Sequence, residues 1–350
     1  MYAQDIFLLI LRLTSKLTNQ MKRILYLLLF CILFVSCKQT YQEEKGTIFR
    51  TYYQIKYQYS SSLAKKINAE FEAFDLSLNP FNPNSILSKV NRNEAVDVDQ
   101  WFTVVFNKAM EVSEQSNGLF DVTAAPLINM WGFGFEHYDD ISPAIIDSLK
   151  TFIGYRKVRL EGRRVVKNDP RIQLSFSAIA KGYACDVIAK LLEREGVKDY
   201  LVDIGGEVAA KGKNASGECW RIGINEPEDE NTYMRNTYKD IVQLCEKSGL
   251  ATSGDYRNFY IKDGKKFAHT INPITGYPAE QNILSATIVA PDCMTADAYA
   301  TVFMVMGLEV ACRFAEQIPE IEYYIIYIGD NGFTQKKYSD GMLSKLVNRK

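Results

Sequence analysis

The chain has 350 residues, of which 47% are hydrophobic and 24% are charged, and its formal net charge at pH 7 is −1. This length can bury a large core, either as one domain or as two closely packed lobes. The near-neutral charge leaves no basic footprint for binding nucleic acid or an anionic membrane surface, so we expect no nucleic-acid partner.

The N-terminal segment has the pattern of a bacterial lipoprotein signal peptide. Residues 21–37 read MKRILYLLLFCILFVSC, a basic start, a short apolar run and a cysteine. The apolar run is typical of a signal peptide and too short for a comfortable membrane span. FVSC resembles a lipobox, in which Cys37 becomes the lipidated first residue. The alternative is an ordinary signal or anchor helix with an incidental cysteine.

These signals predict the organisation of the chain. We expect residues 1–36 to be an upstream extension plus the signal peptide, with Met21 as the initiator. A polar tether would follow over 37–45, and the folded domain over 46–340. A lipid anchor (palmitate) would hold the mature protein at a bacterial inner or outer membrane, on the extracytoplasmic side and most simply facing the periplasm.

The cysteines after this segment predict neither a zinc site nor a disulfide framework. They are Cys185, Cys219, Cys245, Cys293 and Cys312, which are scattered and contain no C-x-x-C pair. Zinc sites need such paired spacing. An oxidising compartment would permit disulfides, but an odd number of scattered cysteines predicts no particular bridge. We expect most of them to be small core residues.

The first half of the folded region predicts one strand followed by helices. IFRTYYQIKYQY (48–59) is rich in β-branched and aromatic residues and alternates as a strand does. Ser61 or Ser62 would cap the first helix, Asn117-Gly118 would end a later one, and Ser142-Pro143 would start another. The expected helices cover 61–78, a short stretch after the turn at 81–84, 97–120 and 141–150.

The second half predicts strands mixed with helices. Expected strands are YRKVRLEG, RRVVKND and RIQLSFS after residue 154, then 199–212, 219–224, 239–248, a hairpin over 258–271, 283–291 and 321–329. Expected helices cover 179–196, 293–307 and 309–317. Because strands and helices do not alternate as regular βαβ units, we predict an α+β fold.

The helix over 293–307, CMTADAYATVFMVMG, carries one carboxylate, Asp297. Thr301 lies four residues later and therefore on the same helical face. Two hard oxygen ligands one turn apart could hold Mg²⁺. The local alternative makes Thr295 the N-cap, with Asp297 in the first turn and favoured by the helix dipole.

Three other motifs are weaker signals on their own. Gly205-Gly206 in DIGGEV indicates either close approach of a ligand phosphate to a strand or a β-bulge. Lys181, at a helix start, could face an anionic phosphate or simply be a solvated lysine. Of the two histidines, His137 lies in a polar stretch, and His269 precedes a Pro- and Gly-rich turn where a structural role is the plainer interpretation.

The order of the motifs resembles the ApbE family. The resemblance rests on Gly46-Thr47, SILSKVN (85–91), NGLFDVTAAPLINMWGFG (117–134), SAIAKGYACD (177–186), DIGGE (203–207), ATSGDY (251–256), HTINPITGYP (269–278) and TADAYAT (295–301). It covers roughly residues 45–330. It implies one compact, T-fold-related α+β unit of two intimate lobes.

The resemblance also implies an activity. ApbE proteins are bacterial, often lipid-anchored FAD:protein FMN transferases. They link FMN, cut from FAD, to a Ser or Thr hydroxyl of a target flavoprotein and release AMP, using Mg²⁺. Their targets are respiratory or extracytoplasmic electron-transfer proteins with a short Ser- or Thr-containing motif.

The family's site residues carry over motif by motif. The implied metal ligands are Asp297, Thr301 and the backbone carbonyl of Ala178. Lys181 would face the pyrophosphate and His269 would act as base or proton shuttle, so His269, Asp297 and Lys181 are the implied catalytic residues. The residues expected to contact FAD are Ser85, Asn91, Asp121, Thr123, Lys181, Asp203, Gly205, Gly206, Thr252, Ser253, Gly254, Asp255 and His269.

This chain departs from the family pattern at two places. Asn272 stands where the family commonly has Asp, and Ser175-Phe176-Ser177 stands where it has Asp-Leu-Gly. Two other functions stay open from the residues: an Mg²⁺-dependent FAD pyrophosphatase yielding FMN and AMP, and a non-catalytic flavin-binding lipoprotein. The second has no need for a metal-ligand pair, so Asp297 with Thr301 argues against it.

Overall fold

The computed structural model describes residues 40–133, 141–225, 238–254, 259–262, 265–268, 270–279 and 282–347. The predicted signal peptide and Cys37 lie outside these residues. The folded unit begins at Tyr41. Within the described residues, no helix has both the length and the apolar character needed to cross a membrane.

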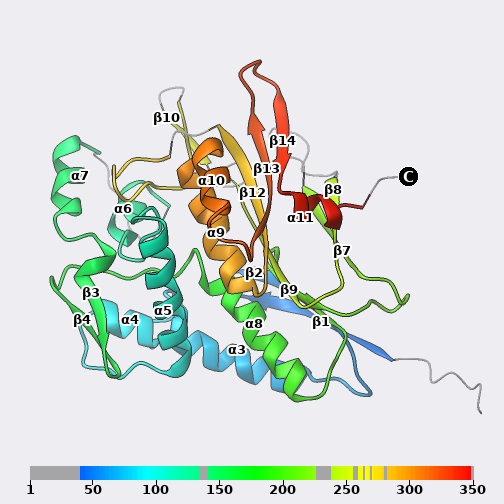
Figure 1. The fold of residues 1–350 in the computed structure, drawn as a ribbon. Helices are drawn as coiled ribbons and strands as arrows, with labels where there is room; N and C mark the ends of the chain where they lie inside the picture. The colour runs from blue at the N-terminus through cyan, green and yellow to red at the C-terminus, as the bar shows by residue number, and fades with distance from the viewer. Residues whose placement is uncertain are drawn as a thin grey trace, which may run out of the picture. The chain divides into compact units, whose positions relative to one another are not determined.

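An eight-stranded sheet, antiparallel throughout, forms the centre of the fold (Figure 1). Its spatial order is β1 (Tyr41–Ile48), β2 (Thr51–Gln58), β5 (Tyr200–Ile204), β6 (Glu207–Lys211), β9 (Ser248–Gly254), β12 (Ile283–Ala290), β13 (Glu322–Ile328) and β14 (Thr334–Tyr338). Three two-stranded ribbons accompany it: β3 (Val158–Glu161) with β4 (Arg164–Lys167), β7 (Trp220–Asn225) with β8 (Tyr238–Leu244), and β10 (Phe259–Lys262) with β11 (Lys265–Ala268).

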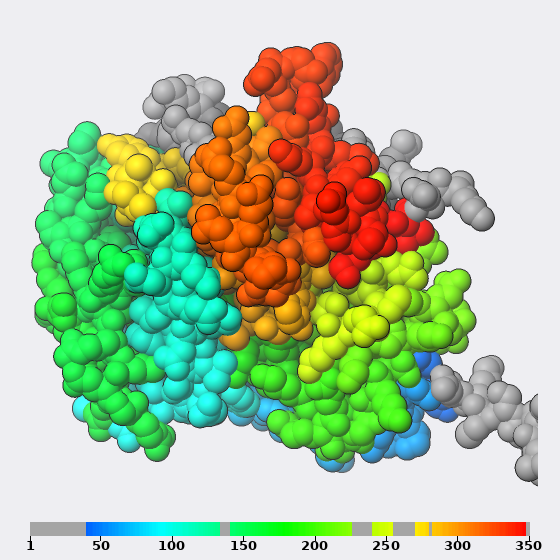
Figure 2. All heavy atoms as spheres, viewed as in Figure 1, coloured from blue at the N-terminus to red at the C-terminus, as the bar shows by residue number. Residues whose placement is uncertain are grey.

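The described helices belong mainly to one side of this sheet. They are α3 (Ala64–Leu78), α4 (Ile86–Asn91), α5 (Gln100–Gln115), α6 (Ala125–Met130), α7 (Pro143–Lys150), α8 (Ala180–Arg194), α9 (Cys293–Met306), α10 (Leu308–Ala315) and α11 (Asp340–Lys345). α8 packs on β5 and β6, and α9 packs on β9 and β12. α3 packs against α8 and α5 packs against α9, and Figure 2 shows α5 beside α9 and α10.

The opposite face of the sheet carries the β7–β8 ribbon and α11. The alternation of side chains along each strand separates the two cores. On β5 and β6, for example, Val202 and Ala209 belong to the large core under α8, whereas Leu201 and Val208 belong to the smaller core under β7 and β8. The middle of the sheet is therefore covered on both faces, by helices on one and by a ribbon on the other, whereas the edge strand β14 is largely exposed.

The predicted α+β class is confirmed, and several local predictions need correction. Part of the predicted tether is strand, because YQEEKGTI pairs along its length with β2. RIQLSFS (171–177) forms no strand. The single strand predicted over 199–212 is a hairpin, in which Gly205 and Gly206 form the turn with φ of +66° and +102°. Such φ values favour glycine. The two glycines, predicted to lie inside a strand, therefore form the turn between β5 and β6.

Helix starts were predicted with mixed success. Ser142 caps α7 and Pro143 is its first residue, as expected. α3, however, begins after Leu63 with no side-chain cap, rather than at Ser61 or Ser62. Among the cysteines, Cys185 and Cys293 are core residues and Cys312 packs against the core, as expected, whereas Cys219 and Cys245 form a disulfide that their spacing did not predict.

Candidate active site

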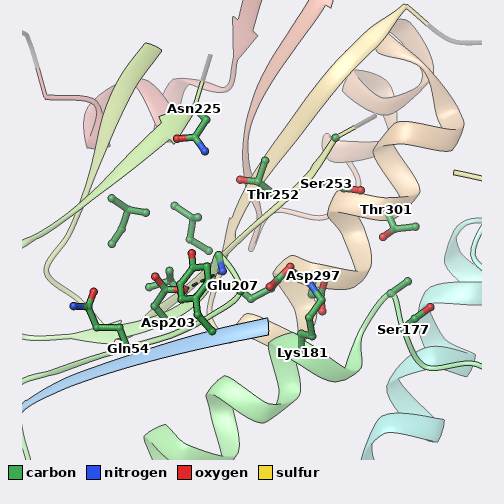
Figure 3. Close-up of a pocket in the computed structure, with 18 of the residues that line it drawn as sticks. Gln54, Ser177, Lys181, Asp203, Glu207, Asn225, Thr252, Ser253, Asp297 and Thr301 are labelled. Atoms are coloured by element: carbon green, nitrogen blue, oxygen red, sulfur yellow. Dashed lines mark hydrogen bonds and ion pairs between the residues drawn. The ribbon is translucent and has the colours of Figure 1, made fainter. Parts of the chain in front are cut away.

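A cavity of about 1720 Å³ collects most of the predicted site residues. Its lining comes from β1, β2, β5, β6, β7 and β9, from the segments around Asp121 and Ala178, and from α8 and α9. Predicted residues that line it are Asp121, Ala178, Lys181, Asp203, Gly205, Gly206, Thr252, Ser253, Gly254, Asp297 and Thr301. Figure 3 shows Lys181, Glu207 and Asp297 together, with Thr301 farther along α9.

Three predicted FAD contacts do not line this cavity. Ser85 is buried and caps α4, where its hydroxyl accepts the Ser88 N–H. Asn91 donates to the Leu174 carbonyl (2.9 Å) and accepts the Leu174 N–H (2.8 Å). Thr123 holds a neighbouring loop together, as the next paragraph describes. Asp255 and His269 lie outside the described residues.

Asp121 is a lining residue whose carboxylate is occupied by its own loop. It accepts the Thr123 N–H and hydroxyl at 2.8 and 2.6 Å, and the Tyr155 N–H at 2.8 Å. Thr123 in turn accepts the Gly154 N–H at 2.7 Å. Burial raises the pKa of Asp121, which these hydrogen bonds partly oppose. These bonds give Asp121 and Thr123 a loop-organising role at the cavity wall.

α9 is held at its N-terminus by two carboxylates. Asp292 is the N-cap and accepts the Thr295 N–H at 2.8 Å, so Thr295 is not the cap. Asp186, from α8, accepts the Cys293 and Met294 N–H groups at 2.9 and 2.8 Å. Burial, with Asp292 nearby, raises the pKa of Asp186 to about 7. Asp186 was missed in the sequence, although its position in the apolar stretch YACDVIA was an available signal.

Asp297 therefore sits beyond the first turn of α9, where capping and the helix dipole do not explain a buried carboxylate. Its Oδ2 accepts the Gly182 N–H of α8 at 2.9 Å. A Cβ on Gly182 would lie 2.3 Å from the Cys293 carbonyl oxygen and 2.7 Å from the Asp297 Cβ. Glycine at this crossing thus lets the two helices approach until backbone meets carboxylate.

Lys181 forms an ion pair with Glu207 beside Asp297. Glu207 and Asp297 are only 4% and 6% exposed, so both would be costly to ionise alone. Burial disfavours the charged form of Lys181, but the carboxylates of Glu207 and Asp297 outweigh burial and raise the pKa of the ammonium. Burial also raises the pKa of Glu207 and of Asp297, and Lys181 opposes both shifts.

Glu207 was not among the predicted site residues. The signal was present, because a carboxylate directly follows the Gly-Gly turn in DIGGE. Its Oε2 is buried and, within the described residues, lacks a hydrogen-bond partner. A buried unpaired oxygen beside a lysine marks a position that a water, a ligand or a residue outside the described part of the chain would complete.

The donor set in this corner fits Mg²⁺. Hydrogen bonds from the described residues reach only one Asp297 oxygen, Oδ2, and Thr301 and Ala178 line the same cavity. Among the described residues, no group of three His, Cys, Asp or Glu side chains gathers as a metal cluster. Mg²⁺ commonly binds one or two carboxylates and completes its shell with water and substrate phosphates. The Asp297 carboxylate, the Thr301 hydroxyl and the Ala178 carbonyl form a donor set of this kind.

The β5–β6 turn shapes the cavity between this corner and the sheet. Asp203 accepts the Gly206 N–H at 2.9 Å, which fixes the turn. A Cβ on Gly206 would meet nothing within 4 Å, so its backbone faces open space. On β9, the Thr252 hydroxyl is hydrogen-bonded to that of Thr287 on β12 at 2.8 Å.

Asn272, one of the departures from the family pattern, organises its own turn. Its Oδ1 accepts the Ile274 N–H at 2.9 Å and the Thr275 N–H at 3.2 Å. An aspartate could accept the same bonds. The Trp131 indole N–H donates to the Gly276 carbonyl of this turn at 2.8 Å, which ties it to α6.

The sequence of this chain matches a known protein family and its curated members. The model of the ApbE family matches residues 49–325. The chain is 33% identical to the FAD:protein FMN transferase of Haemophilus influenzae over 311 residues (84% of this chain, 88% of the relative). It is 32% identical to that of Vibrio cholerae over 333 residues (91% and 97%).

Two solved structures have the same fold. The flavin transferase ApbE from Vibrio cholerae superposes with a TM-score of 0.78 at 30% identity, covering 88% of this chain and 99% of that one. The apbe protein of Thermotoga maritima gives 0.74 at 26% identity, covering 87% and 99%. The residues labelled in Figure 3 all fall within the range that the family model matches.

Proposed function

This chain belongs to the ApbE family, and from that premise we propose that it transfers FMN from FAD to a Ser or Thr hydroxyl of a target flavoprotein in an Mg²⁺-dependent reaction that releases AMP. It is an enzyme, a flavin transferase whose substrate is FAD and whose partner is a flavoprotein. The observation that carries the finer proposal is the ion pair of Lys181 with buried Glu207 next to buried Asp297, with Thr301 lining the same cavity.

The reaction exchanges one phosphorus–oxygen bond for another. The acceptor hydroxyl oxygen attacks the FMN-side phosphorus, the bond to the AMP oxygen breaks, and the hydroxyl proton passes to a base. Bound Mg²⁺ supplies positive charge to the pyrophosphate oxygens. Asp297, Thr301 and the Ala178 carbonyl would hold it. The carboxylates of Glu207 and Asp297 raise the pKa of Lys181, so a protonated Lys181 would supply a second positive charge near the phosphates.

His269 is the proposed base. A histidine has an ordinary pKa near neutrality and can take the hydroxyl proton in the transition state. We expect His269→Gln to lower flavin transfer by about 10²- to 10⁴-fold while FAD affinity stays near that of the unsubstituted protein. If transfer is unchanged and thermal stability falls, His269 has the structural role and the base is another group.

We also propose that the mature protein is lipid-anchored at Cys37 and faces an extracytoplasmic compartment. The lipobox-like FVSC supports this, as does the Cys219–Cys245 disulfide, because disulfides persist in oxidising compartments. Mass spectrometry of membrane fractions should find a diacylated N-terminal Cys37. Recovery of an unprocessed chain would overturn the proposal.

One experiment tests the transferase proposal directly. The protein is incubated with FAD and Mg²⁺, with and without the flavin-accepting domain of an extracytoplasmic electron-transfer protein. We expect AMP and covalently flavinylated acceptor in equal amounts, and neither product after chelation by EDTA. AMP and free FMN without any covalent flavin would mean a pyrophosphatase, and no AMP would mean a flavin-binding protein.

A further inference from the structure

The cavity is larger than one small-molecule substrate requires. Pockets for single ligands commonly enclose about 300–1,000 Å³, whereas this one measures about 1720 Å³. Apart from the corner that holds Asp297, the lining residues fall into two groups. We call the residues from the segments around Phe120 the helical arm, and those from β1, β2, β5 and β7 the polar arm.

The two arms have different chemistry. The helical arm is lined by apolar side chains, including Leu119, Phe120, Val122, Ile128 and Ile271. This suits the flat rings of a dinucleotide. The arm beside β7 is lined mainly by polar groups, among them Gln54, Lys56, Asp203 and Asn225, several of which Figure 3 labels.

The lining residues show which part of each strand, a face or an edge, lines the polar arm. On β2 they alternate as Tyr52, Gln54 and Lys56, so β2 presents one face. On β7 the residues from Trp220 to Gly223 line the arm without a gap. Since successive side chains point to opposite faces of a strand, an unbroken run means that β7 presents its edge, with its backbone groups.

Over Trp220–Asn225, β7 pairs with β8 and with no other strand in the part of the chain that the structure describes. The residue before it, Cys219, bridges to Lys213, so the unpaired edge begins at Trp220. The outer edge of β8, in contrast, is covered near the C-terminus, where Val347 donates its N–H to the Ile241 carbonyl and Leu346 bridges to Val242. An uncovered strand edge offers a row of hydrogen-bonding groups to an extended chain.

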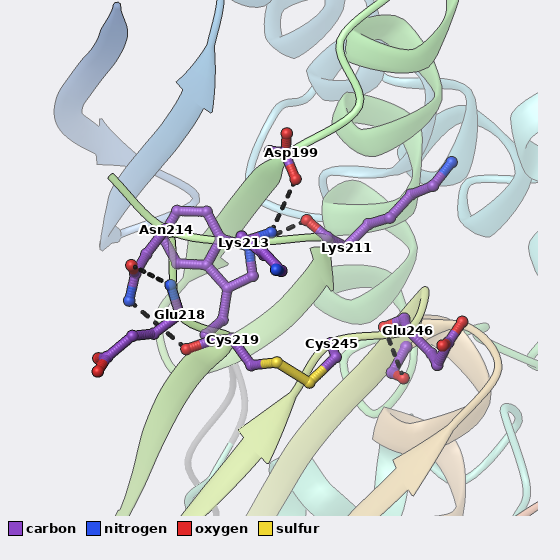
Figure 4. The surroundings of a disulfide bond; sticks show 10 residues. Asp199, Lys211, Lys213, Asn214, Glu218, Cys219, Cys245 and Glu246 are labelled. Carbon is purple, nitrogen blue, oxygen red and sulfur yellow. Dashed lines mark hydrogen bonds between the residues drawn. A yellow bond between two sulfur atoms is a disulfide. The ribbon is translucent and has the colours of Figure 1, made fainter. Parts of the chain in front are cut away.

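The edge is also anchored where β7 begins. The disulfide between Cys219 and Cys245 joins the ends of the two strands, next to the Trp220–Leu244 pair (Figure 4). The Trp220 indole N–H donates to the Lys211 carbonyl at 3.0 Å, and the Gly212 N–H donates to the Cys245 carbonyl at 2.8 Å. The ribbon is thereby fixed to the end of β6, so the edge is presented in one position.

We infer that the target flavoprotein binds here, with the segment that carries its acceptor hydroxyl lying extended along the edge of β7. The inference rests on the proposed transferase function and names the partner's subsite. The six residues of β7 span roughly 20 Å, enough to pair with about six acceptor residues. Asp297 and Lys181 line the same cavity as β7, so an acceptor segment on this edge could place its hydroxyl near the corner where the proposed reaction takes place.

The first test modifies the acceptor and leaves the enzyme unchanged. A series of synthetic peptides of about ten residues, centred on the acceptor Thr, carries one N-methylated backbone amide each. Edge pairing uses the N–H groups of alternate residues. Transfer at low peptide concentration should therefore fall about two- to tenfold at every second position and stay unchanged between them. Loss at every position or at none, with the unmodified peptide still flavinylated, would overturn the edge assignment.

The second test modifies the enzyme. Gly223→Trp adds bulk at a residue of β7 that lines the cavity, and Gln243→Trp adds the same bulk on β8, outside the cavity lining. We expect Gly223→Trp to raise the KM for the acceptor domain at least tenfold, with FAD affinity within twofold of the parent. The Gln243→Trp control should change neither. Weaker FAD binding with an unchanged acceptor KM would assign the arm to the dinucleotide.

These outcomes separate the inference from the function it rests on. If the parent enzyme flavinylates no acceptor at all, the transferase proposal fails. If it flavinylates the acceptor but shows neither the alternating pattern nor the Gly223→Trp effect, only the β7 subsite fails. Melting temperatures of both tryptophan variants identify any that unfold, and the peptide series decides the question in that case.

Discussion

Gly182 donates its backbone N–H to the Asp297 carboxylate at 2.9 Å, across a helix crossing that has no room for a side chain. This contact determines where the carboxylate points. Asp297 Oδ2 is committed to α8, which leaves Oδ1 for the cavity. The position of the proposed metal ligand therefore depends on a residue with no side chain.

Gly182→Ala should damage both stability and activity. The added methyl would meet the Cys293 carbonyl oxygen at 2.3 Å, so α8 and α9 must separate. Overpacking of this kind costs about 1–3 kcal/mol and here also displaces Asp297. Thermal unfolding and the Mg²⁺ concentration for half-maximal activity measure the two effects. Gly329→Ala is the control, because its methyl meets the flexible end of Gln335. Equal behaviour of the two variants would contradict the crossing argument.

Asp297→Asn should reduce Mg²⁺-dependent transfer at least about thousandfold, because charge stabilisation by the ion is worth several kcal/mol. The amide keeps the volume and an oxygen for the Gly182 N–H, so the melting temperature should change little. Asp292→Ala on the same helix is the matched control. It removes the N-cap, which should cost about 1 kcal/mol of stability while the site stays active.

Thr301→Val should lower activity less than Asp297→Asn, since a neutral hydroxyl contributes less to a cation than a carboxylate does. Turnover numbers over a range of Mg²⁺ concentrations make the comparison. A larger loss at Thr301 than at Asp297 would reverse the proposed order of the ligands.

Asp186 should make stability depend on pH. Burial raises its folded-state pKa from 3.8 to about 7, so the folded protein holds a proton that the unfolded chain has lost. The free energy of unfolding should therefore fall as pH rises from about 4 to about 7, then level off. In Asp186→Asn this slope should become smaller, because Glu207, Asp297 and Asp121, whose pKa values burial also raises, keep their own contributions. Urea denaturation at a series of pH values measures the difference, and parallel curves for the two proteins would refute it.

Loss of the Cys219–Cys245 bridge should destabilise the ribbon side of the sheet. A cross-link with a sequence separation of 26 contributes about 3 kcal/mol. The double variant Cys219→Ser/Cys245→Ser should melt at a lower temperature while its FAD affinity holds. Cys312→Ser is the control, because this cysteine is free. An unchanged melting temperature of the double variant would show that packing on Trp220 suffices.

Local chemistry predicted much of the fold. Ser142-Pro143 marked the start of α7, and the apolar run around Asp297 marked α9. The strand-like residues before and after Gly205-Gly206 favour one continuous strand over this stretch. Two glycines between alternating strands are also a hairpin signal, and the positive φ values show that the backbone uses it that way.

The site was harder to predict where residues meet across the chain. Lys181 and Glu207 are 26 residues apart, and Gly182 and Asp297 are 115 apart. Their contacts exist only once α8 has packed on the sheet and on α9. The Cys219–Cys245 pair depends in the same way on the pairing of β7 with β8, which no cysteine spacing reveals. Recognition of family motifs supplied Lys181 and Asp297, but not Glu207 or Asp186.

α9 is buried along nearly its whole length, between the sheet and the helices that pack over it. A molecule that binds Asp297 therefore binds the helix against which both the sheet and the covering helices pack. Ligand bound only to the folded chain raises its stability by RT ln(1 + [L]/Kd), about 2.7 kcal/mol at a hundredfold excess over Kd. A simple melting assay with Mg²⁺ and nucleotide fragments would thus serve as a screen for inhibitors of this enzyme, with no acceptor protein required.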